Sequence, residues 1–219
     1  MLSTPSADRL SEEHLERLPL FPLPSVVLLP GTMLPLHVFE PRYRELTRFC
    51  LEQEWPLAIP MIEPNQTPAE DTAPKLMPVA GAGRIIHHQE IEDGRFLILL
   101  QGIGRIRIEE ERDVDTAYRV ARAVLLPNQV GSTDTIDSDV RTIRDCLTLL
   151  RAKIPNLADA LKSQTGEQSP ASIADSLGAV LFQDAAQKQS LLEEQDVAKR
   201  LRIVRDRVAA LAARTASSD

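Results

Sequence analysis

The sequence predicts an α+β protein with a β-rich first part over residues 1–130 and a C-terminal helical bundle over residues 131–219. Before residue 130, short apolar runs alternate with prolines and glycines, which is typical of strands joined by turns. After it, apolar residues recur three and four positions apart, as on one face of a helix. The small polar run 131–135 is expected to connect the two parts.

In the first part, the three prolines between residues 18 and 25 leave only 26–29 as a confident strand there. Pro41 suits the first turn of a helix, because its missing N–H bonds nothing there, and apolar spacing carries this helix to residue 53. Asp93-Gly94 predicts a hairpin turn. Residues 63–78 hold four prolines and predict a surface loop. The other expected strands cover 57–62, 84–89, 96–100, 104–110 and 118–125.

In the second part, two apolar stripes predict two long amphipathic helices. One runs from Val140 to Ile154 and the other from Val197 to Leu211. Between them, Ser169-Pro170 has the form of a helix cap followed by its first residue. A short helix is expected over 187–194, and Asp196 is expected to cap the last one.

Charge and composition exclude several classes of function. The net charge of −7 disfavours nucleic acid, because phosphate backbones attract clustered positive charge. Cys50 and Cys146 stand far apart, with neither metal-like nor redox-like spacing. The acidic and basic residues of the first twenty positions exclude a signal peptide, and no apolar run is long enough to span a membrane. We therefore expect a cytoplasmic protein without membrane contact, cofactor or metal.

Residues 18–46 read LPLFPLPSVVLLPGTMLPLHVFEPRYREL, and within them PLHVFEPRY at 35–43 is the most specific part. Asp93-Gly94-Arg95, then Gly102 and Arg105, then Tyr118 follow in order, and 188–193 with 196–201 close the pattern. This series strongly resembles the Lon protease N-terminal (substrate-binding) domain family over residues 18–213.

The resemblance implies a PUA-like β-rich pseudobarrel followed by a helical bundle. No Gly-x-x-x-x-Gly-Lys-Ser/Thr phosphate loop occurs in the chain, and too few residues follow the helices to form a protease domain. We therefore expect a stand-alone, non-enzymatic module or adaptor. Its expected partners are unfolded or exposed polypeptide segments, with a separate protease and a homodimer left open.

Capture of unfolded segments requires an exposed apolar patch with a polar rim. The most specific motif supplies the candidates for peptide binding, although most of its apolar side chains also suit a core. The candidate residues are Leu34, Leu36, Phe39, Arg42 and Tyr43.

Three other patterns have a structural explanation. His87 and His88 are adjacent on a strand, so they point to opposite faces and cannot easily share a metal ion. Gly102-Ile103-Gly104 lacks a third glycine and a following helix, and predicts a bulge or bend rather than a dinucleotide site. Glu40 is expected to pair with a nearby arginine or to cap the helix at Pro41, rather than to act with His37 as a catalytic pair.

Two alternative functions remain. RNA binding is suggested by analogy with other PUA-like folds alone, and the negative net charge of the chain disfavours it. A small hydrolase would need a pocket in which titratable groups converge. Its candidates share one predicted sheet: Arg84, His87, Arg105, Arg107 and Glu109.

Overall fold

The computed structural model describes residues 10–64, 73–131, 133–154 and 168–216. The chain divides into two compact units between Leu126 and Pro127, a few residues before the boundary expected from the sequence. The first unit holds a mixed arrangement of strands and short helices, and the second is helical. The expected α+β class is confirmed, whereas the PUA-like pseudobarrel stays a prediction. Each unit is described by itself.

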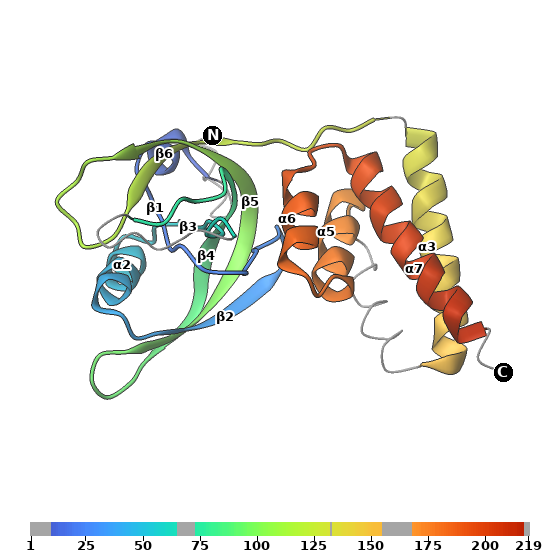
Figure 1. The fold of residues 1–219 in the computed structure, drawn as a ribbon, viewed down its shortest axis with the longest axis horizontal. Helices are drawn as coiled ribbons and strands as arrows, with labels where there is room; N and C mark the ends of the chain where they lie inside the picture. Colours follow the sequence, from blue (N-terminus) through green and yellow to red (C-terminus); the bar gives the residue numbers. More distant parts are fainter. Residues whose placement is uncertain (1–9, 65–72, 132, 155–167, 217–219) are drawn as a thin grey trace, which may run out of the picture. The chain divides into compact units, whose positions relative to one another are not determined.

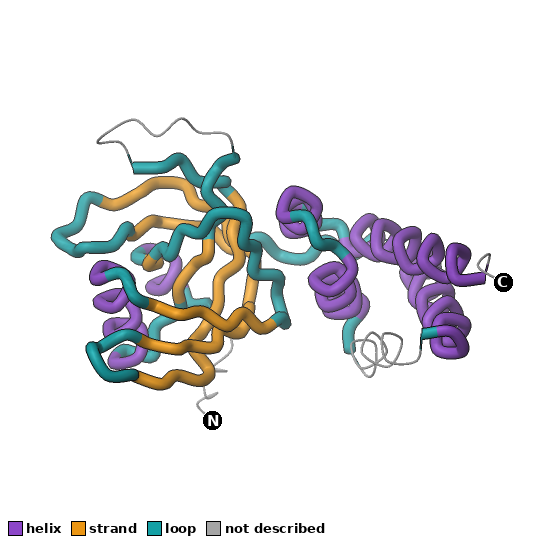
Figure 2. The backbone as a smooth tube through the Cα atoms, turned by 60° about the horizontal axis from the view of Figure 1, so that its bottom comes forward, coloured by secondary structure: helices purple, strands orange, loops and turns teal. Residues whose placement is uncertain are grey.

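The described part of the first unit forms a six-stranded antiparallel sheet in the order β1-β6-β5-β4-β3, with β2 paired to β5 off this path. Figure 2 shows these strands in orange and the loops that join them in teal. The strands are β1 Leu18–Pro19, β2 Met33–Val38, β3 Leu57–Ile59, β4 Val79–Glu90, β5 Phe96–Arg112 and β6 Val120–Leu125. The helices of this unit are α1 Glu12–Glu16 and α2 Pro41–Glu52, of which α1 was not expected.

β5 is one continuous strand, not the two strands expected on either side of Gly102-Ile103-Gly104. Its first half pairs with β2 and its second half with β6, while β4 runs along both. The register against β4 shifts at Ala82/Gly83, opposite the two glycines. The glycines therefore mark a bulge, as the sequence predicts, but the strand continues through it.

The expected strand over 26–29 is absent. Leu28 and Leu29 are buried, but their backbone passes directly over glycines of the sheet instead of pairing alongside a strand. A Cβ added at Gly81 would lie 1.9 Å from the Leu28 carbonyl oxygen, and one at Gly102 would lie 2.2 Å from that of Leu29. The segment is apolar because it covers the sheet, and the glycines give its backbone room.

The turn between β4 and β5 agrees with the prediction from Asp93-Gly94. Both residues have positive φ, of 82° and 74°. The Gly94 amide donates to the Ile91 carbonyl at 3.0 Å. Of the expected loop 63–78, residues 65–72 lie outside the described residues. Its ends meet where Ile62 pairs with Leu76.

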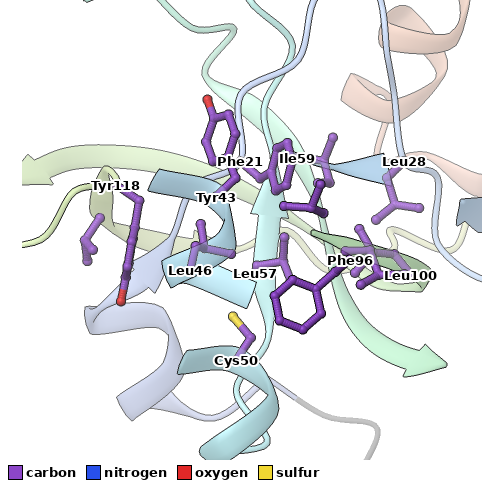
Figure 3. Packing of buried hydrophobic residues seen from close by; sticks show 13 residues of the cluster. Phe21, Leu28, Tyr43, Leu46, Cys50, Leu57, Ile59, Phe96, Leu100 and Tyr118 are labelled. Carbon is purple, nitrogen blue, oxygen red and sulfur yellow. The ribbon is translucent and has the colours of Figure 1, made fainter. Parts of the chain in front are cut away.

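The core of the first unit lies between α2 and the sheet (Figure 3). α2 begins at Pro41, as expected, and buries Tyr43, Leu46, Thr47 and Cys50 on one face. The Tyr43 ring stacks on the Phe21 ring with centroids 4.0 Å apart. Aromatic pairs of this kind stabilise a core by about 0.5–1.5 kcal/mol beyond the area that they bury. The Tyr43 ring thus packs α2 against the chain just after β1, which contains Phe21.

The described helices of the second unit are α3 Thr133–Lys153, α5 Pro170–Leu181, α6 Ala185–Glu193 and α7 Val197–Ala216. Most of the two predicted stripes is buried: Val140, Ile143, Leu147 and Leu150 on α3, and Val197, Leu201, Val204 and Val208 on α7. Their last members, Ile154 and Leu211, are only half-buried, and Ile154 lies just beyond the end of α3. The caps at Ser169 and Asp196 are also confirmed, because each side chain accepts a backbone N–H of the following turn. The expected connector 131–135 is wrong at its end, since α3 already begins at Thr133. No helix among the described residues has both the length and the apolar character of a membrane span.

Candidate functional site

The five predicted peptide-binding residues do not form one surface. Phe39 is 59% exposed and Arg42 is also exposed, whereas Leu34 and Leu36 are half-buried against the core. Tyr43 is only 6% exposed. Phe39 and Arg42 are therefore open to solvent, whereas Leu34 and Tyr43 pack against the core and Leu36 is half-buried between the core and a surface hollow.

The alternation of side chains along β2 explains why some of these residues are exposed and others pack inward. Successive side chains of a strand point to opposite faces. Leu34, Leu36 and Val38 point toward the core, so Met33, Pro35 and His37 point to solvent. Phe39 continues the solvent-facing series just beyond the strand, where its ring lies 5.9 Å from that of His37.

Neighbouring strands extend this exposed surface. Cross-strand pairing places Leu99 between Pro35 and His87, and Leu97 between His37 and Gln89. These residues, together with Leu36 and Ile98, line a hollow of about 440 Å³ that opens on β2, β5 and β4. We call the surface formed by Met33, Pro35, His37, Phe39, Leu97, Leu99, His87 and Gln89 the outer face.

The chemistry of the outer face suits binding rather than catalysis. The described residues that line the hollow include no carboxylate, thiol or hydroxyl group. Their polar groups are two imidazoles and one amide, set around proline and leucine side chains. An apolar recess with a few polar groups at its border is the usual form of a binding site. Such a surface holds apolar side chains and provides no activated nucleophile.

The other sequence patterns have structural roles. His87 lines the outer-face hollow, whereas His88 lines a separate hollow with Arg48 and Glu90, so the two histidines do face apart. Among the residues that the structure describes, no group of three or more His, Cys, Asp or Glu side chains is placed to hold a metal ion.

Glu40 pairs with Arg42 at 2.7 Å, as expected, and makes no side-chain bond that caps α2. The same Arg42 guanidinium lies 4.5 Å from the centre of the Tyr43 ring. Burial raises the pKa of the Tyr43 hydroxyl. The ion pair with Glu40 and the contact with the Tyr43 ring hold the Arg42 side chain at the start of α2, three residues after Phe39.

The residues proposed for a hydrolase are dispersed. Arg84 donates to the Glu54 carbonyl at 2.5 Å, and Glu109 accepts from Arg122. Arg105 is buried, whereas His87 lies on the outer face. These side chains do not converge on one hollow.

Sequence reasoning missed the main apolar residues of the outer face: Met33, Pro35, Leu97 and Leu99. Both alternating sets of β2 are apolar at their start, so a period of two could not show which set is buried. The signal lay in the polar residue His37, which is in phase with Met33 and Pro35. Charge or polarity at one position of a strand marks the face turned to water.

A family model described as the ATP-dependent protease La (LON) substrate-binding domain matches residues 17–209. The Lon protease of Paraburkholderia phytofirmans is 27% identical over 197 residues, which cover 89% of this chain and 24% of that protein. The Lon protease of Trichlorobacter lovleyi is 30% identical over 213 residues, which cover 91% and 25%. This chain thus spans about a quarter of the length of these curated relatives.

Solved structures show the same fold. The N terminal domain of Mycobacterium avium complex Lon protease superposes with a TM-score of 0.66 at 21% identity, covering 89% of this chain and 98% of that one. The Lon N-terminal domain protein from Xanthomonas campestris gives a TM-score of 0.59 at 26% identity, covering 86% and 96%. The resemblance found in the sequence is confirmed, and the chain belongs to the family of ATP-dependent protease La (Lon) substrate-binding domains.

Proposed function

We propose that this protein is a non-enzymatic module that binds unfolded or exposed polypeptide segments, and that the outer face is where it binds them. The observation that carries the proposal is the apolar hollow on β2, β5 and β4, found in a chain whose family model is that of a substrate-binding domain. Leucine and proline side chains on a solvent-facing sheet surface keep apolar area in contact with water, which is unfavourable in free energy. A bound apolar segment would cover that area and remove the cost.

The proposal extends to the setting in which the module acts. We place it in the cytoplasm, as an adaptor that brings polypeptides to a separate protease. Phe39 and Arg42 remain proposed contacts from the original set, at the end of β2 and the start of α2. The four outer-face residues Met33, Pro35, Leu97 and Leu99 are added to them.

The direct test is calorimetry with a permanently unfolded protein, reduced and carboxymethylated lactalbumin. We expect measurable binding with a negative change in heat capacity, because apolar surface leaves water. Absence of binding to this protein and to a varied peptide library would overturn the proposed function.

A matched pair of variants locates the site. Leu97 on the outer face is 44% exposed, and Leu125 on β6 is 46% exposed but lies outside the hollow. Leu97→Glu and Leu125→Glu change the net charge equally, so their difference reports position alone. Burying a leucine side chain contributes about 1.5–3 kcal/mol, so Leu97→Glu should weaken binding on the order of tenfold or more. Equal weakening by both variants would show that the outer face is not the site.

A further inference from the structure

In the part of the chain that the structure describes, β2 has a partner strand on only one side of its backbone. Among the described strands, β2 pairs with β5 alone (Figure 1). In an antiparallel pair, alternate residues direct both backbone groups toward the partner strand, and the residues between them direct both groups away. The opposite side of β2 is therefore an open edge, and the phase of this alternation decides which residues face it.

One hydrogen bond shows which residues of β2 direct their backbone groups toward β5. The Gly102 amide donates to the Thr32 carbonyl at 2.9 Å. Thr32 directly precedes Met33 and Gly102 directly follows Gln101, so the two residues stand opposite each other at the start of the pairing. Thr32 therefore directs its carbonyl toward β5, and Leu34, Leu36 and Val38 follow in the same phase. Met33, Pro35 and His37 direct their backbone groups to the open edge.

Pro35 agrees with this assignment. Proline has no N–H, and within sheets it is confined to positions where that missing donor would face away from the ladder. At its place on β2, Pro35 leaves the pairing with β5 intact. The open edge then presents the N–H and C=O of Met33, the C=O of Pro35, and the N–H and C=O of His37.

The open edge also lacks the charged residues that commonly prevent pairing with another chain. Exposed edges are usually blunted by lysine or other charges, by proline, by bulges or by very short strands. Of these, β2 carries one proline, Pro35, which removes a single donor from the open edge and leaves its C=O as an acceptor. The six residues of β2 read Met-Leu-Pro-Leu-His-Val and include no charged side chain. The register of β2 against β5 is also continuous from Met33 to Val38, without a bulge.

We propose that a polypeptide segment binds in extended form as an additional strand on the open edge of β2. This inference rests on the proposed function and adds the mode of binding. Backbone hydrogen bonds to Met33, Pro35 and His37 would supply affinity that is independent of sequence. Alternate side chains of the segment would point to the same side of the sheet as the outer face, beside Met33, Pro35 and His37, which favours segments with apolar residues at every second position.

An extended segment of another polypeptide fits this edge better than a helix or a second copy of the chain. A helix satisfies its own backbone groups and cannot use those of β2. A second copy that pairs symmetrically about Pro35 would place two prolines opposite each other, so neither carbonyl would receive a hydrogen bond at the centre. A segment with any other residue opposite Pro35 supplies that donor.

Backbone methylation tests the proposal without altering the protein. Short overlapping peptides of carboxymethylated lactalbumin are screened, and the tightest binder is remade in two forms. One form is N-methylated at its even positions and the other at its odd positions. Since only one set of amides can face β2, we expect one form to lose affinity on the order of tenfold or more and the other to keep it. Equal effects of the two forms would overturn strand addition.

Proline substitution tests the same bonds from the side of the protein. His37→Pro removes the amide donor at the open edge and leaves the bonds to β5, whereas His37→Ala removes only the imidazole. We expect His37→Pro to bind the same peptide about fivefold more weakly than His37→Ala, the effect of one backbone hydrogen bond. Circular dichroism and a thermal melt confirm that both variants fold, and a Met33→Pro and Met33→Ala pair repeats the comparison if the first pair does not.

The outcomes separate the two proposals. Binding of whole carboxymethylated lactalbumin without any binding peptide, or equal binding by the proline and alanine variants, overturns strand addition and leaves polypeptide binding in place. No binding of the whole unfolded protein overturns both. Sedimentation that shows a dimer, dissociated by His37→Pro, would mean that a second copy occupies the edge and would overturn the assignment to another polypeptide.

Discussion

Replacement of Arg200 by methionine should strongly destabilise the helical unit. Arg200 is fully buried at 0% exposure. Its Nη1 donates to the carbonyls of Glu194 at 2.7 Å and Gln195 at 3.1 Å, and its Nη2 donates to Asn128 Oδ1 at 2.7 Å. Its Nε lies 3.3 Å from Asp175 Oδ1. One guanidinium thus joins α7 to α5, to the end of α6 and to the chain that enters the unit.

The loss of stability in Arg200→Met should be large because the Asp175 carboxyl group stays buried after its partner is removed. Asp175 has a side chain only 3% exposed, so methionine at position 200 would leave a buried group without its cation and three acceptors without their donor. Removing one partner of a buried ion pair costs about 3–5 kcal/mol. Since single domains are stable by only about 5–15 kcal/mol, the loss is a large part of the whole.

Urea unfolding followed by far-ultraviolet circular dichroism measures this loss. Arg202→Met is the matched control, because Arg202 is exposed on the same helix, and we expect its effect to stay within about 0.5 kcal/mol. The double variant Arg200→Met, Asp175→Leu should recover part of the stability, since it removes the buried group as well. An Arg200→Met protein as stable as the Arg202→Met control would refute this account of the ion pair.

Three further predictions concern local packing. Gly102→Ala should destabilise by a few kcal/mol in urea unfolding, because the new Cβ would lie 2.2 Å from the Leu29 carbonyl oxygen. Gly104→Ala, whose nearest contacts are side-chain carbons at 3.4 Å, should cost much less. Burial raises the pKa of the Cys50 thiol from 9.0 to about 12. The unfolded chain therefore loses this proton first, and stability should fall as the pH rises from 9 to 12, more steeply than in a Cys50→Ala variant. Ser169→Ala should lower stability by about 1 kcal/mol through loss of the α5 cap, and an unchanged urea midpoint would contradict that role.

The sequence predicted the elements whose signals are local. Caps at Ser169 and Asp196, the proline start of α2 and the Asp93-Gly94 turn each depend on a few neighbouring residues. The stripes of α3 and α7 are equally local, because a helix repeats its buried face every few residues. These elements lie close to the expected boundaries.

Elements that depend on distant partners were predicted less well. The apolar run 26–29 has strand composition, but it lies over Gly81 and Gly102, and nothing in the run itself indicates those glycines. The buried face of β2 could not be assigned from its apolar residues, because Leu34 and Leu36 are as apolar as Met33 and Pro35. Within β2 only the polar residue His37 marks the set that faces water, and the packing of Leu34 and Leu36 against the core agrees with it.

Amide hydrogen exchange along β2 is the most direct test of polypeptide binding at this edge. In the free protein, the amides of Leu34 and Leu36 should be protected by β5, whereas those of Met33 and His37 should exchange quickly. Saturation with the tightest-binding peptide should protect Met33 and His37 and leave the other two unchanged. Rapid exchange at Met33 and His37 with the peptide fully bound would contradict the account.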